Sequence, residues 1–368
     1  MRQPPCQYFN KCAGCSTQHI EYSLQLENKK KNLMQSFHID DVKVFSGNEF
    51  NYRNRMEFLF NKNGPGLRRK DNSIINIDRC IIANDKINLL LLEVKNHFKD
   101  VDAFDFRRKT GTLCYVLIRT ASEKSSISFV LNEDSNQIDC LVEKINSFSK
   151  LTTSDSVIIT YTSSDSPDSI SENYLVVKGN DTLNELFLGN RFEYSVQGFF
   201  QNNTEVAKMM HNYVRSLLEK YLGKQIYLLD LYAGVGTFGI NNSDLFKQVT
   251  IVESFQKCID SAKFNISNNN ISNAVAISLD AKKIKNLQFN KPLVVIIDPP
   301  RTGMHNETIA TLNKLLPLSI IYVSCNLNQL RKDIPKFKRY TIKDVALFDQ
   351  FPQTNHMEVV IELMLNNV

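Results

Sequence analysis

Cys325 is the residue of this sequence best placed to act as a nucleophile. It lies in Ser324-Cys325-Asn326, directly after the apolar run 319–323 and before a helix-compatible segment at 327–333. The run is typical of a buried strand, and ligands of open α/β sheets bind outside the carboxyl ends of the strands. Most free cysteines are buried and inert, so position alone does not establish chemistry for this thiol.

The C-terminal half of the sequence predicts an α/β domain with a mostly parallel sheet. Short apolar runs alternate there with helix-length segments, which is the pattern of buried parallel strands joined by helices. The expected strands are 226–231, 249–253, 274–279, 293–297 and 319–323, followed by 341–347 and 357–363. An amphipathic helix is expected at 205–221, before the first of these strands.

Glycines and carboxylates follow the first four expected strands. They are Gly234 and Gly236 after the first strand, then Glu253, Asp280 and Asp298 at the ends of the next three. Such glycines let a ligand approach the backbone, and an acidic residue about twenty positions later typically holds ribose hydroxyls. The pattern therefore predicts a nucleoside pocket. A nicotinamide cofactor stays open, because Gly239 completes G-x-G-x-x-G, although Asp298-Pro299-Pro300 favours another ligand.

Three cysteines near the N-terminus have the spacing of a metal or cluster site. Cys6, Cys12 and Cys15 lie within ten residues, and Gly14 allows the tight turn that directs thiolates to one centre. Zinc and iron–sulfur sites commonly use four cysteines, and Cys80 is the best candidate for the fourth ligand. A [4Fe–4S] cluster fits three clustered cysteines plus a remote one. Zinc, or no metal, remains open.

Residues 45–192 predict a β-rich domain with two helices. Basic residues recur there, at Arg53 and Arg55, at 68–70 and at 107–109, the last group beside phenylalanines. Such groups suit phosphate neutralisation and base stacking, although an ordinary soluble surface is an equal alternative. The net charge of +5 permits an RNA or DNA partner without requiring one. Lysines 29–31, on a helix expected at 23–37, are expected to form a solvated face.

The totals set broad limits on the kind of protein this is. A chain of 368 residues is expected to hold two or three domains. No stretch approaches the roughly 18 consecutive apolar residues of a membrane span, and the N-terminus lacks the apolar core of a signal peptide. A monomeric, cytoplasmic protein without a membrane partner is expected. Its eight cysteines are not expected to form disulfides.

Four motifs occur in the order typical of one enzyme family. They are Phe-Phe-Gln-Asn at 199–202, Asp-Pro-Pro-Arg at 298–301, Ser-Cys-Asn at 324–326 and Phe-Pro-Gln-Thr-Asn-His-Met-Glu at 351–358. The combination resembles the RNA uracil-C5 methyltransferases that use S-adenosylmethionine, over nearly the whole chain. The cysteines Cys6, Cys12, Cys15 and Cys80 resemble the iron–sulfur site of the branch that modifies 23S rRNA and of its archaeal relatives. Ala233 departs from the family, where many members have cysteine.

The resemblance implies catalytic roles for two residues. Cys325 matches the nucleophile that adds to C6 of uracil and so enables C5 to attack a methyl group. Glu358 matches the base that removes the C5 proton before β-elimination frees the cysteine. His356 is expected to pack rather than to assist. The target base of a folded RNA must be flipped into the pocket.

The resemblance also implies a cofactor site, a fold and a substrate. The residues implied to bind S-adenosylmethionine are Gln201, Tyr232, Gly234, Gly236, Thr237, Glu253, Asp280 and Asp298. The implied domains are an iron–sulfur segment at 1–44, a β-rich central domain at 45–192 that contributes Cys80, and a class I, Rossmann-like methyltransferase domain at 193–368. The family's TRAM domain has no counterpart before Cys6, which favours 23S rRNA as substrate.

Other functions stay open at this point. The same reaction on a tRNA uridine is the nearest alternative. A catalytically silent iron–sulfur protein that binds RNA is the alternative from another class, since a fold does not by itself imply activity. A nicotinamide enzyme would leave Ser-Cys-Asn and His-Met-Glu unexplained.

Overall fold

The computed structural model describes residues 2–366 and shows two compact units. Unit 1 comprises Met1–Glu21, Asn48–Glu185 and Tyr194–Asn202; unit 2 comprises Tyr22–Gly47, Leu186–Glu193 and Asn203–Val368. The three-part division expected at residues 44 and 192 stays a prediction, because compactness does not test which segments fold independently.

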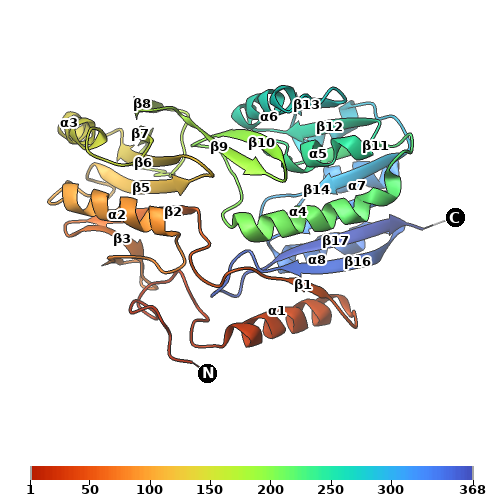
Figure 1. The fold of residues 1–368 in the computed structure, drawn as a ribbon, viewed down its shortest axis with the longest axis horizontal. Helices are drawn as coiled ribbons and strands as arrows, with labels where there is room; N and C mark the ends of the chain where they lie inside the picture. The colour runs from red at the N-terminus through yellow and green to blue at the C-terminus, as the bar shows by residue number, and fades with distance from the viewer. Residues whose placement is uncertain (1, 367–368) are drawn as a thin grey trace. The chain divides into compact units, whose positions relative to one another are not determined.

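Unit 1 is built on a seven-stranded sheet in the order β4-β3-β2-β5-β6-β7-β8, in which only β6 and β7 pair in parallel. The strands are β2 (Arg55–Asn61), β3 (Gly64–Arg68), β4 (Ile74–Asn76), β5 (Leu113–Thr120), β6 (Ser125–Asn132), β7 (Ser156–Thr162) and β8 (Tyr174–Lys178). Helices α2 (Asp85–His97) and α3 (Ile138–Ser149) share a core with this sheet, where Leu90 and Phe148 are buried with Phe58. These strands and the two helices lie within residues 45–192, where a β-rich domain with two helices was predicted (Figure 1).

Unit 2 is built on an eight-stranded sheet in the order β1-β16-β17-β15-β14-β11-β12-β13. Its strands are β1 (Lys43–Phe45), β11 (Tyr227–Leu231), β12 (Gln248–Glu253), β13 (Ala274–Ser278), β14 (Leu293–Ile297), β15 (Ser319–Ser324), β16 (Tyr340–Phe348) and β17 (Glu358–Leu365). All neighbours pair in parallel except β17, which is antiparallel to both β15 and β16. A separate hairpin pairs β9 (Thr182–Phe187) with β10 (Asn190–Ser195).

Helices pack on both faces of the unit 2 sheet. Helices α1 (Tyr22–Phe37), α7 (Asn306–Leu315) and α8 (Leu327–Asp333) share one core with alternate residues of β11, β14 and β15. Alternate residues of the same strands, such as Val294 and Ile296, point to the opposite face of the sheet. Helices α4 (Thr204–Leu218), α5 (Thr237–Asn241) and α6 (Gln256–Asn268) pack on that face, and none of their described residues belongs to the first core. Short 3-10 turns lie at η1 (Glu219–Tyr221), η2 (Ser243–Leu245), η3 (Ala281–Asn286) and η4 (Ile334–Lys336).

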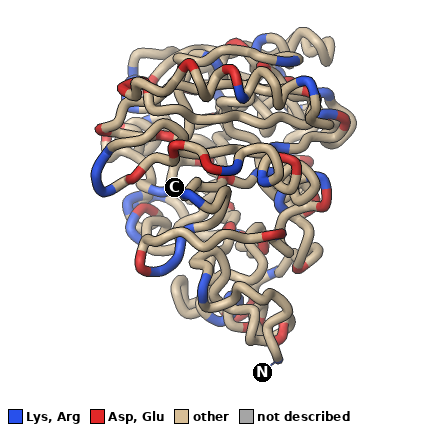
Figure 2. The backbone as a smooth tube through the Cα atoms, turned by 90° about the vertical axis from the view of Figure 1, so that its left-hand side faces the viewer, with Lys and Arg blue, Asp and Glu red and all other residues tan. Residues whose placement is uncertain are grey.

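Charge is distributed without segregation along the chain. Figure 2 shows basic and acidic residues interspersed along the backbone, in keeping with 44 Lys and Arg against 39 Asp and Glu. The expected solvated lysine face is wrong in one respect. Lys29 is only 5% exposed and pairs with Asp349 at 2.6 Å, whereas Lys31 is exposed. Within the described part of the chain, no helix combines the length and apolar character that crossing a membrane requires.

Candidate active site

The antiparallel pairing of β17 with β15 brings Cys325 and Glu358 together at the carboxyl end of β15. Ser324 pairs with Val359, so the next residue outward is Cys325 on one strand and Glu358 on the other. The parallel strand β14 also ends there, where Asp298 follows Ile297. The structure therefore brings together three residues that the sequence analysis had assigned to catalysis or cofactor binding.

Asn326 holds the turn that presents Cys325. Its side-chain oxygen accepts hydrogen bonds from the backbone N–H groups of Asn328 at 3.1 Å and Gln329 at 3.3 Å, which makes it the N-cap of α8. Its amide Nδ2 donates to the backbone carbonyl of Arg301 at 2.8 Å. The Ser-Cys-Asn and Asp-Pro-Pro-Arg motifs are thus joined directly.

Arg301 is a site residue to which the sequence analysis gave no role. Its guanidinium hydrogen-bonds the Cys325 side chain and lowers the pKa of that thiol. The opposing effects are larger: burial, and then the carboxylates of Glu358 and Asp298, raise the pKa of Cys325 to about 11. In the sequence, the only sign of a role for Arg301 is its position directly after Asp-Pro-Pro. That position does not show where the Arg301 side chain points.

The two carboxyl groups beside Cys325 resist ionisation; Glu358 is buried and Asp298 is half-buried. Glu358 is 5% exposed, and burial followed by the nearby Asp298 raises its pKa well above the ordinary value of 4.5. Burial also raises the pKa of Asp298 to about 7. A carboxylate that is hard to ionise is a strong base once it is ionised, so Glu358 is suited to removing a proton from carbon.

A cavity of about 320 Å³ opens beside the thiol. It is lined by Asn32, Arg301, Cys325, Asn326, Leu327, Asn328, Asn355, His356 and Met357. Four of these residues carry amides, which both donate and accept hydrogen bonds and so suit the polar edge of a nucleobase. His356 is exposed here, and its ring lies 6.2 Å from that of Phe351.

The loop after β11 leaves space for a ligand against the backbone. Tyr232, Gly234 and Gly236 all have positive φ, at 58°, 53° and 84°. A Cβ on Gly234 would meet no atom within 4 Å, so the backbone is open there. The Gly234 N–H donates to Glu253 Oε2 at 3.2 Å, which connects the loop to the end of β12.

Asp230 is a second residue that the sequence analysis did not assign. It is fully buried on β11, and its Oδ2 accepts a hydrogen bond from the Gly239 N–H at 2.7 Å. Its Oδ1 has no hydrogen-bond partner within the described chain, 2–366. Burial, and then nearby Asp298 and Glu253, raise the pKa of Asp230 to about 8. Asp230 therefore joins β11 to α5.

The remaining cofactor residues lie in different settings. Thr237 begins α5, and Asp280 accepts a hydrogen bond from the Lys282 N–H at 2.9 Å where η3 begins. Gln201 belongs to unit 1, where its carbonyl accepts a hydrogen bond from Asn54 Nδ2 at 2.9 Å. Their contacts with S-adenosylmethionine stay a prediction.

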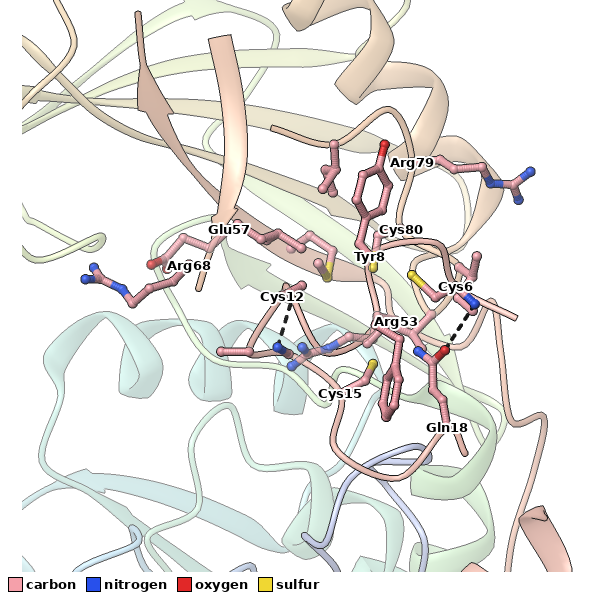
Figure 3. A pocket seen from close by; sticks show the side chains of 18 of the residues that line it. Cys6, Tyr8, Cys12, Cys15, Gln18, Arg53, Glu57, Arg68, Arg79 and Cys80 are labelled. Carbon is pink, nitrogen blue, oxygen red and sulfur yellow. Dashed lines mark hydrogen bonds between the residues drawn. The ribbon is translucent and has the colours of Figure 1, made fainter. Parts of the chain in front are cut away.

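The four cysteines predicted to bind a cluster share one cavity of unit 1. Cys6, Cys12, Cys15 and Cys80 surround a space of about 370 Å³ (Figure 3), although Cys80 follows β4 far along the chain. Burial, and to a smaller extent neighbouring thiols, raises the pKa of Cys15 to about 12. Among residues 2–366, no group of three or more His, Cys, Asp or Glu is placed to hold a metal ion.

This sulfur-lined space is nevertheless suited to a larger group. A cluster of four irons and four sulfides is wider than one ion, so its ligands stand further apart than those of a single metal. Cys140, in contrast, is exposed on α3 and does not line the cavity. Cysteine thiols are the usual ligands of such clusters, and binding of a cluster here stays a prediction.

Comparison with known proteins places the chain among RNA-modifying enzymes. Residues 21–366 match the family described as tRNA (uracil-5-)-methyltransferase. An uncharacterized RNA methyltransferase of Caldanaerobacter subterraneus subsp. tengcongensis is 32% identical over 380 residues, which cover 97% of this chain and 84% of the relative. One from Staphylococcus aureus is 30% identical over 382 residues, covering 97% of this chain and 83% of the relative.

A solved structure supports the same grouping. The tRNA (uracil-54, C5)-methyltransferase of Pyrococcus abyssi, in complex with S-adenosyl-L-homocysteine, superposes with a TM-score of 0.80. The two proteins are 26% identical, and the match covers 99% of this chain and 88% of the other.

Proposed function

The chain belongs to the RNA uracil-5-methyltransferase family, and from this premise we propose which residues catalyse the reaction and which RNA is modified. Membership makes it an enzyme that methylates C5 of uracil in RNA with S-adenosylmethionine as donor. When bound, S-adenosylmethionine supplies an electrophilic methyl group. We assign its binding to Gln201, Tyr232, Gly234, Gly236, Thr237, Glu253, Asp280 and Asp298.

In the proposed reaction, Cys325 is the nucleophile. Its deprotonated sulfur forms a bond to C6 of uracil, and the electron pair of the C5–C6 double bond moves toward the C4 carbonyl as an enolate. C5 then attacks the methyl group of the donor, whose bond to the sulfonium sulfur would break as S-adenosyl-L-homocysteine leaves. Arg301 favours the thiolate, because its guanidinium hydrogen-bonds the Cys325 side chain.

Glu358 completes the proposed cycle as the base. It takes the C5 proton, the double bond between C5 and C6 re-forms, and the C6–sulfur bond breaks to release Cys325. The observation that carries this assignment is the strand register, since the pairing of Ser324 with Val359 makes the nucleophile and the base neighbours. Burial supports the base role, because it raises the pKa of Glu358.

We also propose that Cys6, Cys12, Cys15 and Cys80 hold a [4Fe–4S] cluster. Four thiols from two distant segments around one cavity support this assignment. The proposed role is structural, because Cys325 already supplies the nucleophile. The cluster would link the N-terminal segment covalently to Cys80, which follows β4 of the unit 1 sheet.

The proposed substrate is a uridine of 23S rRNA, bound by a monomer of this chain. The cysteine set supports this choice through its resemblance to the 23S rRNA branch. A tRNA uridine is the second candidate, favoured by the likeness to the Pyrococcus abyssi tRNA enzyme. Unit 1 offers a surface suited to RNA, since the Arg68 guanidinium lies 5.4 Å from the centre of the Phe106 ring.

Mapping 5-methyluridine in a deletion strain tests the substrate. We expect one position of 23S rRNA to lose the methyl group, and the intact gene but not a Cys325→Ala gene to restore it. Loss confined to tRNA would replace rRNA with tRNA as the substrate. Unchanged 5-methyluridine in both RNA classes would contradict the proposed function.

A further inference from the structure

Helix α1 buries a partly polar face against other segments of unit 2. Its buried residues are Gln25, Lys29 and Leu33, which are spaced four apart and therefore lie on one side of the helix. A lysine and a glutamine are unusual at buried positions unless specific partners satisfy them. Both side chains form hydrogen bonds with the loop 349–357, which connects β16 to β17.

Lys29 binds residues at the beginning of this loop. Its Nζ lies 2.6 Å from Asp349 Oδ1 and donates a second hydrogen bond to the Phe351 carbonyl at 3.3 Å. The Asp349 side chain is fully buried, and its Oδ2 accepts a hydrogen bond from the Tyr22 hydroxyl at 2.9 Å. Two residues of α1 therefore fix both carboxylate oxygens.

Gln25 forms hydrogen bonds with the middle of the same loop. Its Nε2 donates to Gln353 Oε1 at 3.0 Å, and its Oε1 accepts the Gln353 backbone N–H at 3.2 Å. Gln353 is fully buried with φ at 68°, a left-handed conformation that residues other than glycine rarely adopt. Such conformations persist where the surroundings impose them, and they gather at functional sites.

The loop that α1 holds ends at the proposed base. Phe348 and Glu358 are paired residues of β16 and β17, so the loop leaves the sheet and returns at Glu358. Asn32 of α1 also lines the cavity beside Cys325, together with Asn355 of the loop. Helix α1 therefore borders the catalytic cavity and fixes the segment that delivers the base.

We propose that Lys29, Asp349, Gln25 and Gln353 are positioning residues for the proton-removal step. They hold loop 349–357 in the one conformation that directs Glu358 at the uracil bound to Cys325. This inference rests on the proposed function. It predicts that loosening α1 slows resolution of the Cys325 adduct more than its formation.

The test uses two variants and one control. In Lys29→Met with Asp349→Leu, both charges are removed together, because one buried charge left alone would destabilise the fold. In Gln353→Gly, the left-handed backbone remains accessible, while the hydrogen bond from Gln25 to the side chain is removed. Lys30→Met is the control, since Lys30 pairs with the 81% exposed Asp41 outside the loop.

Comparing the rates of adduct formation and of turnover distinguishes loss of Glu358 positioning from a general loss of folded structure. Adduct formation with 5-fluorouridine RNA requires no proton removal from C5, whereas turnover of uridine RNA does. We expect the two loop variants to form the fluorouridine adduct within about threefold of the parent rate and to turn over at least about tenfold more slowly. The control should match the parent in both rates.

Three outcomes would overturn the inference. Unchanged turnover would show that α1 does not position the base. An equal decrease in both rates, or failure of both variants to fold, would show a purely structural role. If the parent chain itself forms no adduct, the proposed function fails first, which distinguishes that failure from a failure of the α1 proposal.

Discussion

Burial gives Glu358, Asp298 and Cys325 properties that these side chains lack in water. The pKa of each side chain is raised, chiefly by desolvation. Asp298 also raises the pKa of Glu358, and both carboxylates raise the pKa of Cys325. Arg301 is the one cation shown to act on both Cys325 and Glu358. The site therefore disfavours the charged forms of all three groups.

Replacing Glu358 with Gln should trap the reaction and stabilise the fold. The variant keeps Cys325, so the covalent adduct should accumulate on uridine RNA while product release falls by at least about 100-fold. Denaturing gels of the complex and the release of methylated RNA measure these two quantities. Normal turnover would remove Glu358 from the base role.

The gain in folding stability expected for Glu358→Gln should increase with pH. A folded-state pKa above the ordinary 4.5 means that Glu358 stabilises the fold below that pH and loses this contribution as the pH rises through the folded pKa. Gln mimics the protonated form, so thermal unfolding should show a larger gain for the variant at pH 8 than at pH 4. For a chain of 368 residues, a gain of about 1 kcal/mol corresponds to roughly 1–2 °C.

Glu362→Gln is the matched control for this effect. Glu362 is equally buried on β17, but it pairs with Lys220, so its replacement removes an ion pair rather than an ionisation cost. That variant should be less stable than the parent at pH 8. A stabilised Glu362→Gln, or a destabilised Glu358→Gln, would contradict the account of the site.

Individual site residues were predictable where they follow a strand. Cys325 and Asp298 each come directly after a buried apolar run, so their place at the sheet edge follows from the pattern. Arg301 was missed because a loop side chain has no periodicity. Asp230 was missed because a buried charge in the middle of an apolar strand resembles an interruption, and only its contact with Gly239 shows its setting.

Among the elements, the strands of the unit 2 sheet and the extent of α1 were predictable, since a helix was expected at 23–37 and α1 spans Tyr22–Phe37. The packing of α1 was not predictable. Parallel strands covered on both faces are continuous apolar runs, which is why β11, β14 and β15 match the expected positions. The face of α1 that meets loop 349–357 is polar, so hydrophobic periodicity predicts it to be solvated. The pairing of β1 with β16 was not predictable, because it joins segments about three hundred residues apart.

The N-terminal cysteine segment should depend on the proposed cluster. Iron and sulfide analysis of anaerobically purified protein should give four of each per chain, as expected for one [4Fe–4S] cluster. Cys80→Ala should lose most of the iron, whereas Cys140→Ala should retain it, because Cys140 is exposed and outside the cavity. One equivalent of zinc without iron would exclude the cluster.

At the scale of the whole molecule, each unit carries a different part of the proposed activity. Unit 2 contains the nucleophile, the base and most of the implied cofactor residues, whereas unit 1 contains the cysteine cavity and the basic groups. Arg68 and Arg107 are distant in sequence, yet Phe106 next to Arg107 lies under the Arg68 guanidinium. The two predicted basic groups therefore belong to one surface of unit 1.

This surface should contribute to RNA affinity rather than to chemistry. Replacing Arg107 and Arg108 with Ser should weaken RNA binding and reduce the slope of log affinity against log salt by about 1 for each phosphate that the variant no longer neutralises. Turnover at saturating RNA should stay within about twofold of the parent. Lys208→Ser, in α4 of unit 2, is the control, and an unchanged salt slope in the double variant would exclude this surface.

The central claim is that Cys325 bonds to the uracil that becomes methylated. The most direct measurement is denaturing gel and mass analysis of the protein with 5-fluorouridine RNA and S-adenosylmethionine. The account predicts a stable covalent complex whose cross-linked peptide contains Cys325, absent in Cys325→Ala and retained in Cys140→Ala. A complex that persists in Cys325→Ala, or methylation of uridine RNA by that variant, would contradict it.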